Sequence, residues 1–433
     1  MKTQIGRDTL CTGCGTCAAI CPDNVIEMRK NSRGTYAPIL KDTSCKECEL
    51  CVKVCPGISV NLIELNKRIF GKAPKNVLVG NYINCYVGHS TDERVVYGSA
   101  SGGIATTFLI FALEEGLIDG AIVTKMDASN PLEPEVFIAR TRDEIISASK
   151  SKYCPVPVNI ALKYVLTHND RLAIVGLPCH IHGLMKAELH RRELKDRIIL
   201  RIGLFCGHTV TFSGTKFLLD RMGVKAEDVV KLDYRSRGWP GGMTVKLADN
   251  SEKFLPLQFY WDYFFASFFF TPIHCTLCSD QTNELADISL GDAWLPELMK
   301  NNKGESIIIT RTKVGEKILR KAKQKGKVIA TRVDNNEVIR SQRSSIYFKK
   351  KGLVARMSVM KLVGKKVPEI RSKLLGPRGL TAYLGAMLTY FNIYVSSRNS
   401  LQRVLMYVPL PILRLYRKIV IGASIGESIL RHK

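Results

Sequence analysis

The sequence predicts an α+β protein in three parts: a small N-terminal unit held by metal-binding cysteines, a larger α/β body and a helical basic tail. Three observations support this division. Eight cysteines form two regular runs near the N-terminus, apolar strands alternate with amphipathic helices from Val77 onward, and basic residues gather in the last ninety positions. The expected boundaries are 1–62 for the cysteine unit, 77–165 and 166–344 for the two portions of the body, and 345–433 for the tail.

The two cysteine runs share one spacing. Each run has three cysteines separated by two residues, and a fourth cysteine follows three residues later, directly before a proline. This spacing holds [4Fe–4S] clusters, and in two-cluster ferredoxins of the bacterial type the fourth cysteine of each run binds the other cluster. The first cluster is therefore assigned to Cys11, Cys14, Cys17 and Cys55. The second cluster is assigned to Cys45, Cys48, Cys51 and Cys21.

Two other interpretations of these cysteines are weaker. A zinc site usually shows pairs of ligands, not triplets with a distant fourth. A disulfide scaffold needs an oxidising compartment, yet the stretch that begins at Met1 reaches the first cysteine run without an apolar secretory segment. We therefore expect a cytoplasmic protein that binds two [4Fe–4S] clusters in residues 1–62, followed by a basic linker over 66–75.

The first helix of the body has a small, flexible entry. Residues 95–103 are expected as a strand or turn that leads into a helix over 104–115, with Gly116 at its C-terminal end and a strand over 121–124. The Ser/Gly-rich entry suits a phosphate group, because free backbone N–H groups and the helix dipole both favour an anion. A tight turn packed under a neighbouring element is the alternative.

Two cysteines follow strands expected over 171–175 and 198–204. Cys179 and Cys206 stand just past the carboxyl ends of these strands, where open α/β sheets bind their ligands. A helix is also expected near 159–167. With a later Cys-x2-Cys pair they would complete the ligand set of a third [4Fe–4S] cluster. The full set is Cys179, Cys206, Cys275 and Cys278.

The spacing alone leaves an alternative for this third set. Cys179 and Cys206 are then small buried residues, and the later pair is half of a zinc site. Three histidines stand beside these cysteines, and such histidines more often form hydrogen bonds in a core than bind metal. They are His180, His182 and His208.

The motifs together resemble the family of coenzyme F420 hydrogenase and dehydrogenase beta subunits, preceded by a two-[4Fe–4S] ferredoxin domain. The resemblance covers about residues 1–325 and leaves the tail outside. One departure is His180, which stands where the family often has glutamine after the Pro-Cys. The matching blocks are Ser101-Gly102-Gly103, 117–121, Ser151-Lys152-Tyr153, 176–179, 204–207, 235–241, Cys275-x2-Cys278, 286–294, and Gly304 with Ser306, Arg311 and Thr312.

The resemblance implies a body that binds FAD beside an iron–sulfur cluster. It implies that the third cysteine set binds that cluster, and that coenzyme F420 or another substrate stacks on the flavin. No catalytic residue is assigned. The cofactor-binding residues that it implies are Ser101, Gly102, Gly103 and Thr106 for the flavin phosphates or ribityl chain, Lys152 and Tyr153 beside the flavin, and Arg235 and Trp239 on the substrate side.

The expected function is an iron–sulfur flavoprotein oxidoreductase. FAD can exchange a hydride with coenzyme F420 and pass single electrons to clusters, and these lead to a partner protein, a partner subunit or a membrane carrier. Lys152, Arg235 and Arg237 fit the acidic groups of coenzyme F420, although solvated surface charges are the alternative. Other hypotheses are a ferredoxin-linked FAD/Fe–S reductase of another organic substrate, a non-catalytic electron-relay subunit, and a basic membrane adaptor with structural clusters.

The tail carries most of the positive charge. The chain has 64 Lys and Arg against 39 Asp and Glu, a net of +25, and 345–433 holds 17 basic and 2 acidic residues, a net of +15. Residues 379–397 have no charge, but Thr381 and Thr389 make them polar for a membrane span. We expect helices that lie on an anionic membrane at the inner face, or else a helical subdomain packed on the body. No nucleic-acid-binding pattern accompanies the charge.

Overall fold

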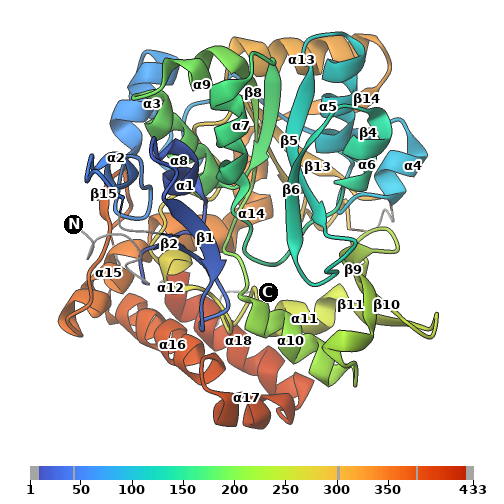
Figure 1. The fold of residues 1–433 in the computed structure, drawn as a ribbon. Helices are drawn as coiled ribbons and strands as arrows, with labels where there is room; N and C mark the ends of the chain where they lie inside the picture. The colour runs from blue at the N-terminus through green and yellow to red at the C-terminus, as the bar shows by residue number, and fades with distance from the viewer. Residues whose placement is uncertain (1–8, 42–43, 300–302, 377–378, 426–433) are drawn as a thin grey trace.

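The computed structural model describes residues 9–41, 44–299, 303–376 and 379–425. All fourteen cysteines lie within these ranges. The N-terminal residues from Met1 and residues 426–433 of the expected tail lie outside the described part. The fold mixes helices and sheets, with one large sheet at the centre and most helices around it (Figure 1).

The central sheet has the strand order β14-β4-β13-β12-β8-β7-β5-β6. β12, β8, β7 and β5 run parallel to one another, whereas β6 pairs antiparallel with β5, and β13, β4 and β14 form antiparallel pairs on the other side. The strands are β4 Asn84–Ser90, β5 Gly120–Met126, β6 Pro134–Ala139, β7 Leu172–Gly176, β8 Ile198–Leu204, β12 Ile288–Asp292, β13 Ser306–Thr310 and β14 Val328–Val333.

Helices cover both faces of this sheet because alternate strand residues point to opposite sides. Ala121 and Val123 join the core beneath α5 and α13, whereas Ile122 joins the core beneath α7 and α8. The helices of the body are α4 Glu93–Tyr97, α5 Ile104–Glu114, α6 Arg142–Ser147, α7 Leu162–Thr167, α8 Pro178–Glu188, α9 Arg192–Arg197 and α13 Lys313–Gln324, with the 3-10 helix η1 Val158–Ala161 before α7.

One short segment differs from its expected structure. The residues from Val95 to Tyr97, expected as a strand or turn, belong to helix α4. The Asp92 side chain accepts hydrogen bonds from the backbone N–H groups of Arg94 and Val95, and this N-cap starts a helical turn. The expected elements around it, α5, β5, α7, β7 and β8, are present.

The N-terminal unit packs on the α7–α8 face of the body. Ile20, Val54 and Leu62 enter the same core as residues of α7 and α8. Helix α3 extends to Phe70, so half of the expected linker is helical; the Asn61 side chain caps this helix by accepting a hydrogen bond from the Glu64 N–H. The elements of this unit are α1 Thr16–Ile20, β1 Ile26–Lys30, β2 Tyr36–Leu40, α2 Leu50–Lys53, β3 Ser59–Asn61 and α3 Leu62–Phe70.

A second, three-stranded antiparallel sheet lies between the body and the C-terminal helices. Its strands are in the order β11-β10-β9. Its apolar residues share a core with α10 and α11. These elements are α10 Phe212–Arg221, the 3-10 helix η2 Ala226–Asp228, β9 Val229–Ser236, β10 Gly242–Leu247, β11 Glu252–Pro256, α11 Leu257–Tyr263 and α12 Ile273–Thr276.

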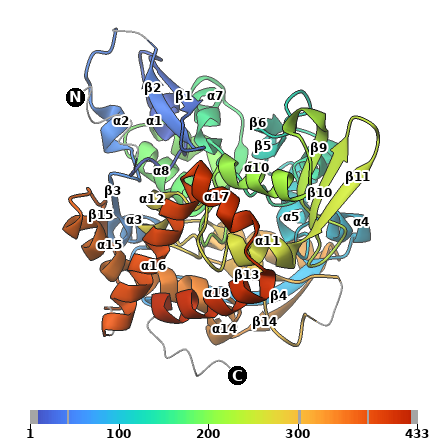
Figure 2. The ribbon, with the colours of Figure 1, turned by 90° about the horizontal axis from the view of Figure 1, so that it is seen from below.

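The C-terminal residues contact both earlier parts of the chain. β15 pairs in parallel with β3 of the N-terminal unit, and Phe348 stacks on Phe268 with ring centroids 4.3 Å apart. Seen from below, three helices lie together across this end of the molecule (Figure 2). Within the described ranges, no helix combines the length and the apolar character needed to cross a membrane. The elements are α14 Asn335–Lys350, α15 Leu353–Leu362, β15 Glu369–Arg371, α16 Leu380–Ser396, α17 Asn399–Met406 and α18 Leu410–Ile425.

Candidate cofactor-binding site

The first ferredoxin-type set of cysteines lines one small cavity. Cys11, Cys14, Cys17 and Cys55 all contribute to its wall, which encloses about 40 Å³. Burial, and then the charges of the neighbouring cysteines, raise the pKa of Cys17 well above its usual range. Buried thiolates repel one another unless a cation neutralises them, so this donor set fits an iron–sulfur cluster.

The second set also converges. Burial raises the pKa of Cys51 to about 11, and the charges of Cys48, Cys21 and Cys45 add to that rise. The four side chains are therefore close enough to influence one another. Cys21 comes from the end of α1 and the other three from the loop and helix around α2, so the fourth ligand crosses between the two runs.

The four cysteines of the body line a third cavity, of about 50 Å³. Cys179 lies in the first turn of α8, Cys206 follows β8, and Cys275 and Cys278 lie in and just after α12. Burial raises the pKa of Cys179 well above its usual range, and its nearest electrostatic neighbours are Cys14, Cys206, Cys275 and Cys278. The donor set fits a third cluster by the same reasoning.

The third cavity adjoins the first one. Leu10, Thr12 and Pro56 of the N-terminal unit contribute to the walls of both cavities. In the part of the chain that the structure describes, no three Cys, His, Asp or Glu side chains are close enough to bind a single metal ion. Each cysteine of a [4Fe–4S] cluster binds a different iron atom, so such a site holds its sulfur atoms further apart.

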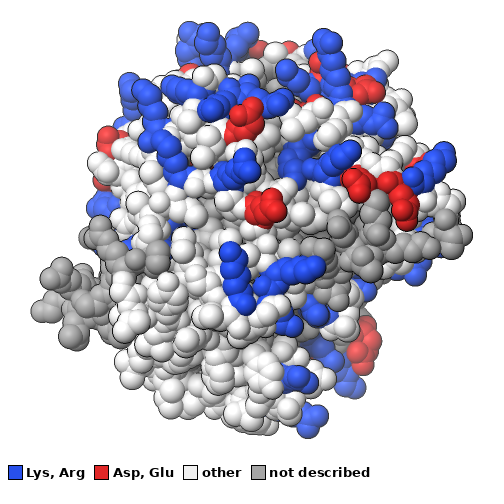
Figure 3. Space-filling view, turned by 90° about the vertical axis from the view of Figure 1, so that its left-hand side faces the viewer, with Lys and Arg blue, Asp and Glu red and all other residues white. Residues whose placement is uncertain are grey.

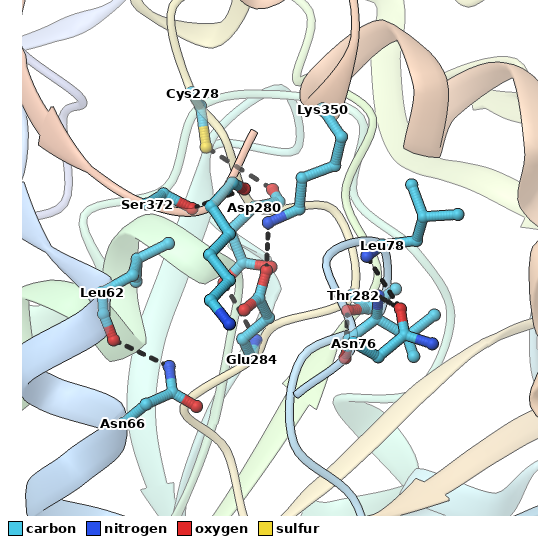
Figure 4. A network of polar contacts seen from close by, with 12 residues as sticks. Leu62, Asn66, Asn76, Leu78, Cys278, Asp280, Thr282, Glu284, Lys350 and Ser372 are labelled. Atoms are coloured by element: carbon cyan, nitrogen blue, oxygen red, sulfur yellow. Dashed lines mark hydrogen bonds and ion pairs between the residues drawn. The ribbon is translucent and has the colours of Figure 1, made fainter. Parts of the chain in front are cut away.

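Charged side chains from helix α14 approach the third cysteine set. The Lys349 ammonium group, 2% exposed, donates a hydrogen bond of 2.8 Å to the backbone oxygen of Cys275. Burial raises the pKa of Cys206, and the Lys349 charge opposes that rise most strongly. Next along the helix, Lys350 forms a buried ion pair with Glu284 (Figure 4). These contacts place positive charge beside the cysteines.

Glu284 belongs to a wider polar network that surrounds Cys278. Figure 4 shows Cys278 beside Asp280, and the cysteine sulfur is 3.5 Å from the Asp280 backbone oxygen. The Asp280 carboxylate is 2.8 Å from Nε2 of His182 and accepts a 2.9 Å hydrogen bond from the Glu284 N–H. His182 is thus bound to a carboxylate.

The other two histidines near the cysteines also hydrogen-bond within the protein. His180 Nδ1 accepts a 3.0 Å hydrogen bond from the Leu177 N–H, and its Nε2 is 3.0 Å from the Val156 oxygen. His208 Nε2 is 3.1 Å from the Phe264 oxygen. Burial lowers the pKa of His180 to about 4 and that of His208 to about 3, so both rings are neutral at physiological pH.

The largest of the described cavities, about 370 Å³, lies above the carboxyl ends of β7 and β8. Its volume is typical of a site for a small molecule or cofactor. Cys206 lines this cavity and also the third cysteine cavity, so the two share a wall. Phe265 and Trp261 of the α11 region contribute aromatic surface, and the N-terminal end of α5 faces the cavity from the other side.

Five of the eight residues implied for flavin or substrate line this large cavity. Gly103, with a φ of 73°, provides the left-handed N-cap of α5, and the free N–H groups of the first turn favour an anion. Ser101 donates a 2.6 Å hydrogen bond to the Glu305 oxygen, which fixes the loop before the helix. The five residues are Ser101, Gly103, Thr106, Lys152 and Tyr153.

The other three implied residues stand outside the wall of this cavity. Gly102 packs against the neighbouring strand, where a Cβ atom would lie 2.6 Å from the Gly88 oxygen. Arg235 is 1% exposed and donates hydrogen bonds to Tyr153, Asp292 and the Ala100 oxygen, all of which belong to residues that line the cavity. Arg235 therefore orders the wall from behind.

The remaining aromatic and basic residues have defined partners. Trp239 packs on Trp294, with ring centroids 4.6 Å apart, and Trp294 lines the cavity. Burial lowers the pKa of Lys152 to about 7, and its ammonium group donates a 2.6 Å hydrogen bond to the Ala148 oxygen. Arg237, at the surface, pairs with Glu252. Of the three cations expected near coenzyme F420, only Arg237 is largely exposed.

Sequence reasoning missed several residues of the cavity wall. Trp261 and Phe265 lie in an aromatic stretch between 259 and 270 that belongs to none of the recognised motifs, although its density of Phe, Tyr and Trp is a usable signal. Asp292 belongs to a recognised block but had no assigned role; burial raises the pKa of its carboxyl. Phe348 and Ser424 line the cavity from the tail. Their participation had no signal in the sequence.

The fold and the cysteine sets define an iron–sulfur protein of an oxidoreductase type. A model described as a 4Fe–4S dicluster domain matches residues 10–58. Models described as the N-terminal and C-terminal parts of the coenzyme F420 hydrogenase/dehydrogenase beta subunit match residues 85–163 and 169–336. The chain belongs to the family of coenzyme F420 hydrogenase/dehydrogenase beta subunits.

Individual relatives agree with this membership. The chain is 30% identical over 256 residues to a coenzyme F420 hydrogenase subunit beta of Methanothermobacter thermautotrophicus, which covers 58% of this chain and 84% of the relative. It is 26% identical over 329 residues to a subunit of the F420H2 dehydrogenase of Methanosarcina mazei, or 72% and 82% of the two chains. Both relatives are subunits by name.

A solved structure shares the fold. A chain of the F420-reducing [NiFe] hydrogenase complex from Methanosarcina barkeri superposes with a TM-score of 0.54 at 22% identity, covering 68% of this chain and 98% of that one. The likeness extends to the arrangement of elements. The family models end at residue 336, so α15 to α18 lie beyond them.

Proposed function

We propose that this protein is an iron–sulfur flavoprotein subunit that moves electrons between coenzyme F420 and one-electron carriers. The observation that carries the proposal is the shared wall at Cys206. One residue borders both the large cavity and the cavity of the four body cysteines. A two-electron carrier in the first and a one-electron centre in the second would be neighbours.

The large cavity is the proposed FAD site. Bound there, FAD would supply the conversion between a hydride and single electrons. The start of α5, with Gly103 and Thr106, would hold the phosphate or ribityl part, because its free N–H groups attract negative charge. Tyr153, held by Arg235, and the aromatic residues of the α11 region would border the ring system and exclude water.

The three cysteine sets are the proposed cluster sites, with the ligands that the spacing assigns. Their order supports a path from the large cavity through the body cysteines to the N-terminal unit, because Leu10, Thr12 and Pro56 border two neighbouring cavities. Lys349 would make the body site easier to reduce by placing a buried positive charge beside it. The set of Cys45, Cys48, Cys51 and Cys21 would deliver electrons to a partner.

The relatives bear on the electron donor and the partner. Two of them carry coenzyme F420 or its reduced form in their names, and we infer the same coenzyme here. A partner protein or subunit would exchange single electrons near the N-terminal unit. We also propose a cytoplasmic location, which the reduced cysteines and the coenzyme both require.

The test is a stopped-flow experiment on anaerobically purified protein that carries its cofactors. Mixed with reduced coenzyme F420, the protein should bleach the flavin absorbance first and the cluster absorbance afterwards. Protein with measured flavin and iron that stays oxidised would refute the assignment of coenzyme F420. Protein that binds no flavin under reconstitution would refute the assignment of the large cavity.

A further inference from the structure

The three C-terminal helices present an unusual exposed surface. On α16, the side chains at positions i, i+4, i+7, i+11 and i+14 from residue 380 are all apolar or aromatic, and each of these residues is more than half exposed. This spacing places them in one stripe along the helix. The stripe consists of Leu380, Leu384, Met387, Phe391 and Tyr394.

The opposite side of α16 is the side that packs on the protein. Ala382 and Ala386 are buried, and the Asn392 amide donates a 2.7 Å hydrogen bond to the Ser267 oxygen. The stripe is therefore a second apolar face on a helix whose own core contacts are already made. A soluble surface seldom carries a continuous apolar stripe of this length without a binding role.

The neighbouring helices extend this surface. Val404 and Tyr407 at α17 are 64% and 86% exposed, and Ile412 and Leu415 on α18 are 59% and 65% exposed. α16 packs against both α17 and α18, and Figure 2 shows the three helices together at the lower end of the molecule. We call the α16 stripe and these four residues the apolar end face.

The charges around the apolar end face are of one sign. The sequence has no Asp or Glu between 370 and 425, whereas Arg398, Arg403 and Lys418 are exposed on these helices or their junctions. Figure 3 shows a broad uncharged surface at the lower part of the molecule, with lysine and arginine at its border. Two further arginines of α18 pair with the buried carboxylate of Asp262, so they also fix the helix to the body.

We propose that the apolar end face docks on an anionic membrane surface, such as the phosphatidylserine- or phosphatidylglycerol-bearing leaflet of a bilayer. Exposed apolar side chains next to basic ones match a surface with an apolar interior and negative headgroups. Tyr394 and Tyr407 suit the headgroup level, where amphipathic rings gather. The face is formed by the outer sides of helices, so it rests on the leaflet and does not cross it.

This docking would hold the electron-transfer site close to the bilayer while leaving the N-terminal unit to the side. In Figure 1 the α16–α18 helices lie at the lower end and the N-terminal unit at the left. The proposal does not depend on FAD or coenzyme F420, since it rests on residues outside the family models. Its test can therefore fail or succeed independently of the proposed function.

The experiment is sedimentation of the full-length protein, with its cofactors, on vesicles of phosphatidylcholine with roughly 30% phosphatidylserine. The protein should bind these vesicles at least tenfold more tightly than pure phosphatidylcholine vesicles. Met387→Glu with Phe391→Glu should lower the binding at least tenfold, because both changes place a negative charge on the exposed stripe. The matched control is Ile329→Glu, a residue 54% exposed on β14, which should leave binding unchanged.

A second variant tests the charge alone. Arg398→Gln with Arg403→Gln should weaken binding to the anionic vesicles about tenfold or more and change binding to pure phosphatidylcholine little, since each basic residue contributes roughly fivefold. Circular dichroism and iron content report whether each variant is folded. Wild-type protein that ignores anionic vesicles would overturn the proposal. A wild-type dimer in solution that the Met387/Phe391 variant dissociates would overturn it in favour of a second copy on this face.

Discussion

The buried ion pair between Lys350 and Glu284 supports a prediction about what the tail contributes to the body. Both side chains are 2% exposed, and Lys350 approaches from α14 while Glu284 lies beside the body cysteines (Figure 4). Lys350→Met leaves a buried carboxylate without its cation. Removing one partner of such a pair costs about 3–5 kcal/mol, because the remaining charge has lost its solvation and its partner.

The expected loss can be measured as a melting temperature. For a chain of 433 residues, 3–5 kcal/mol corresponds to a fall in Tm of roughly 3–6 °C. The matched control is Arg340→Met on the same helix, where Arg340 pairs with Glu297 and both side chains are about half exposed. That variant should lose less than about 1 kcal/mol, since exposed pairs contribute little.

The pH dependence of the loss adds a second measurement. Burial raises the pKa of Glu284, and the Lys350 charge opposes that rise, so Lys350→Met lets the pKa rise further. A carboxyl whose pKa is higher in the folded than in the unfolded state makes the folded state relatively more stable as the pH falls. The deficit of Lys350→Met against wild type should therefore be larger at pH 8 than at pH 5.

A second substitution at Glu284 separates the unpaired charge from a simple loss of packing. Adding Glu284→Gln to Lys350→Met removes the unpaired charge and should recover most of the lost stability. If Lys350→Met and Arg340→Met lowered the Tm equally, or if the double variant stayed as unstable as the single one, the contact would not be the buried ion pair that holds α14 to the body.

Two further predictions concern the cofactor sites. Cys275→Ser should remove about a third of the bound iron and slow the reoxidation of reduced flavin, as measured by iron assay and stopped flow; unchanged iron and unchanged reoxidation would refute the third cluster. Gly103→Ala should weaken FAD binding, measured by flavin titration of the apoprotein, because alanine is strained at a φ of 73° and its Cβ would lie 3.0 Å from Val95 at the entry to the cavity. Gly116→Ala is the matched control: it has a φ of 62° at the other end of α5 and open space around it, so FAD binding should not change.

Local sequence alone predicted the features that depend on neighbouring residues. The two cysteine runs match the dicluster domain, because three ligands at short spacing lie on one loop whatever the rest of the chain does. The helix and strand from 104 to 126 were also predictable, since apolar periodicity and a small residue at each helix end act over a few positions. The expected Val95 to Tyr97 turn failed because the Asp92 cap outweighed the β-branched residues.

Contacts between distant segments were decided only by the tertiary structure. Cys206 borders two cavities because the parallel order of β7 and β8 brings their carboxyl ends together, and strand order is not written in any one segment. The tail read as a separate basic piece, yet Lys349 and Lys350 are buried beside the body cysteines and β15 extends the sheet of the N-terminal unit. A basic residue in a sequence carries the same charge whether it pairs with a buried carboxylate or faces water, and only the packing of α14 distinguishes the two.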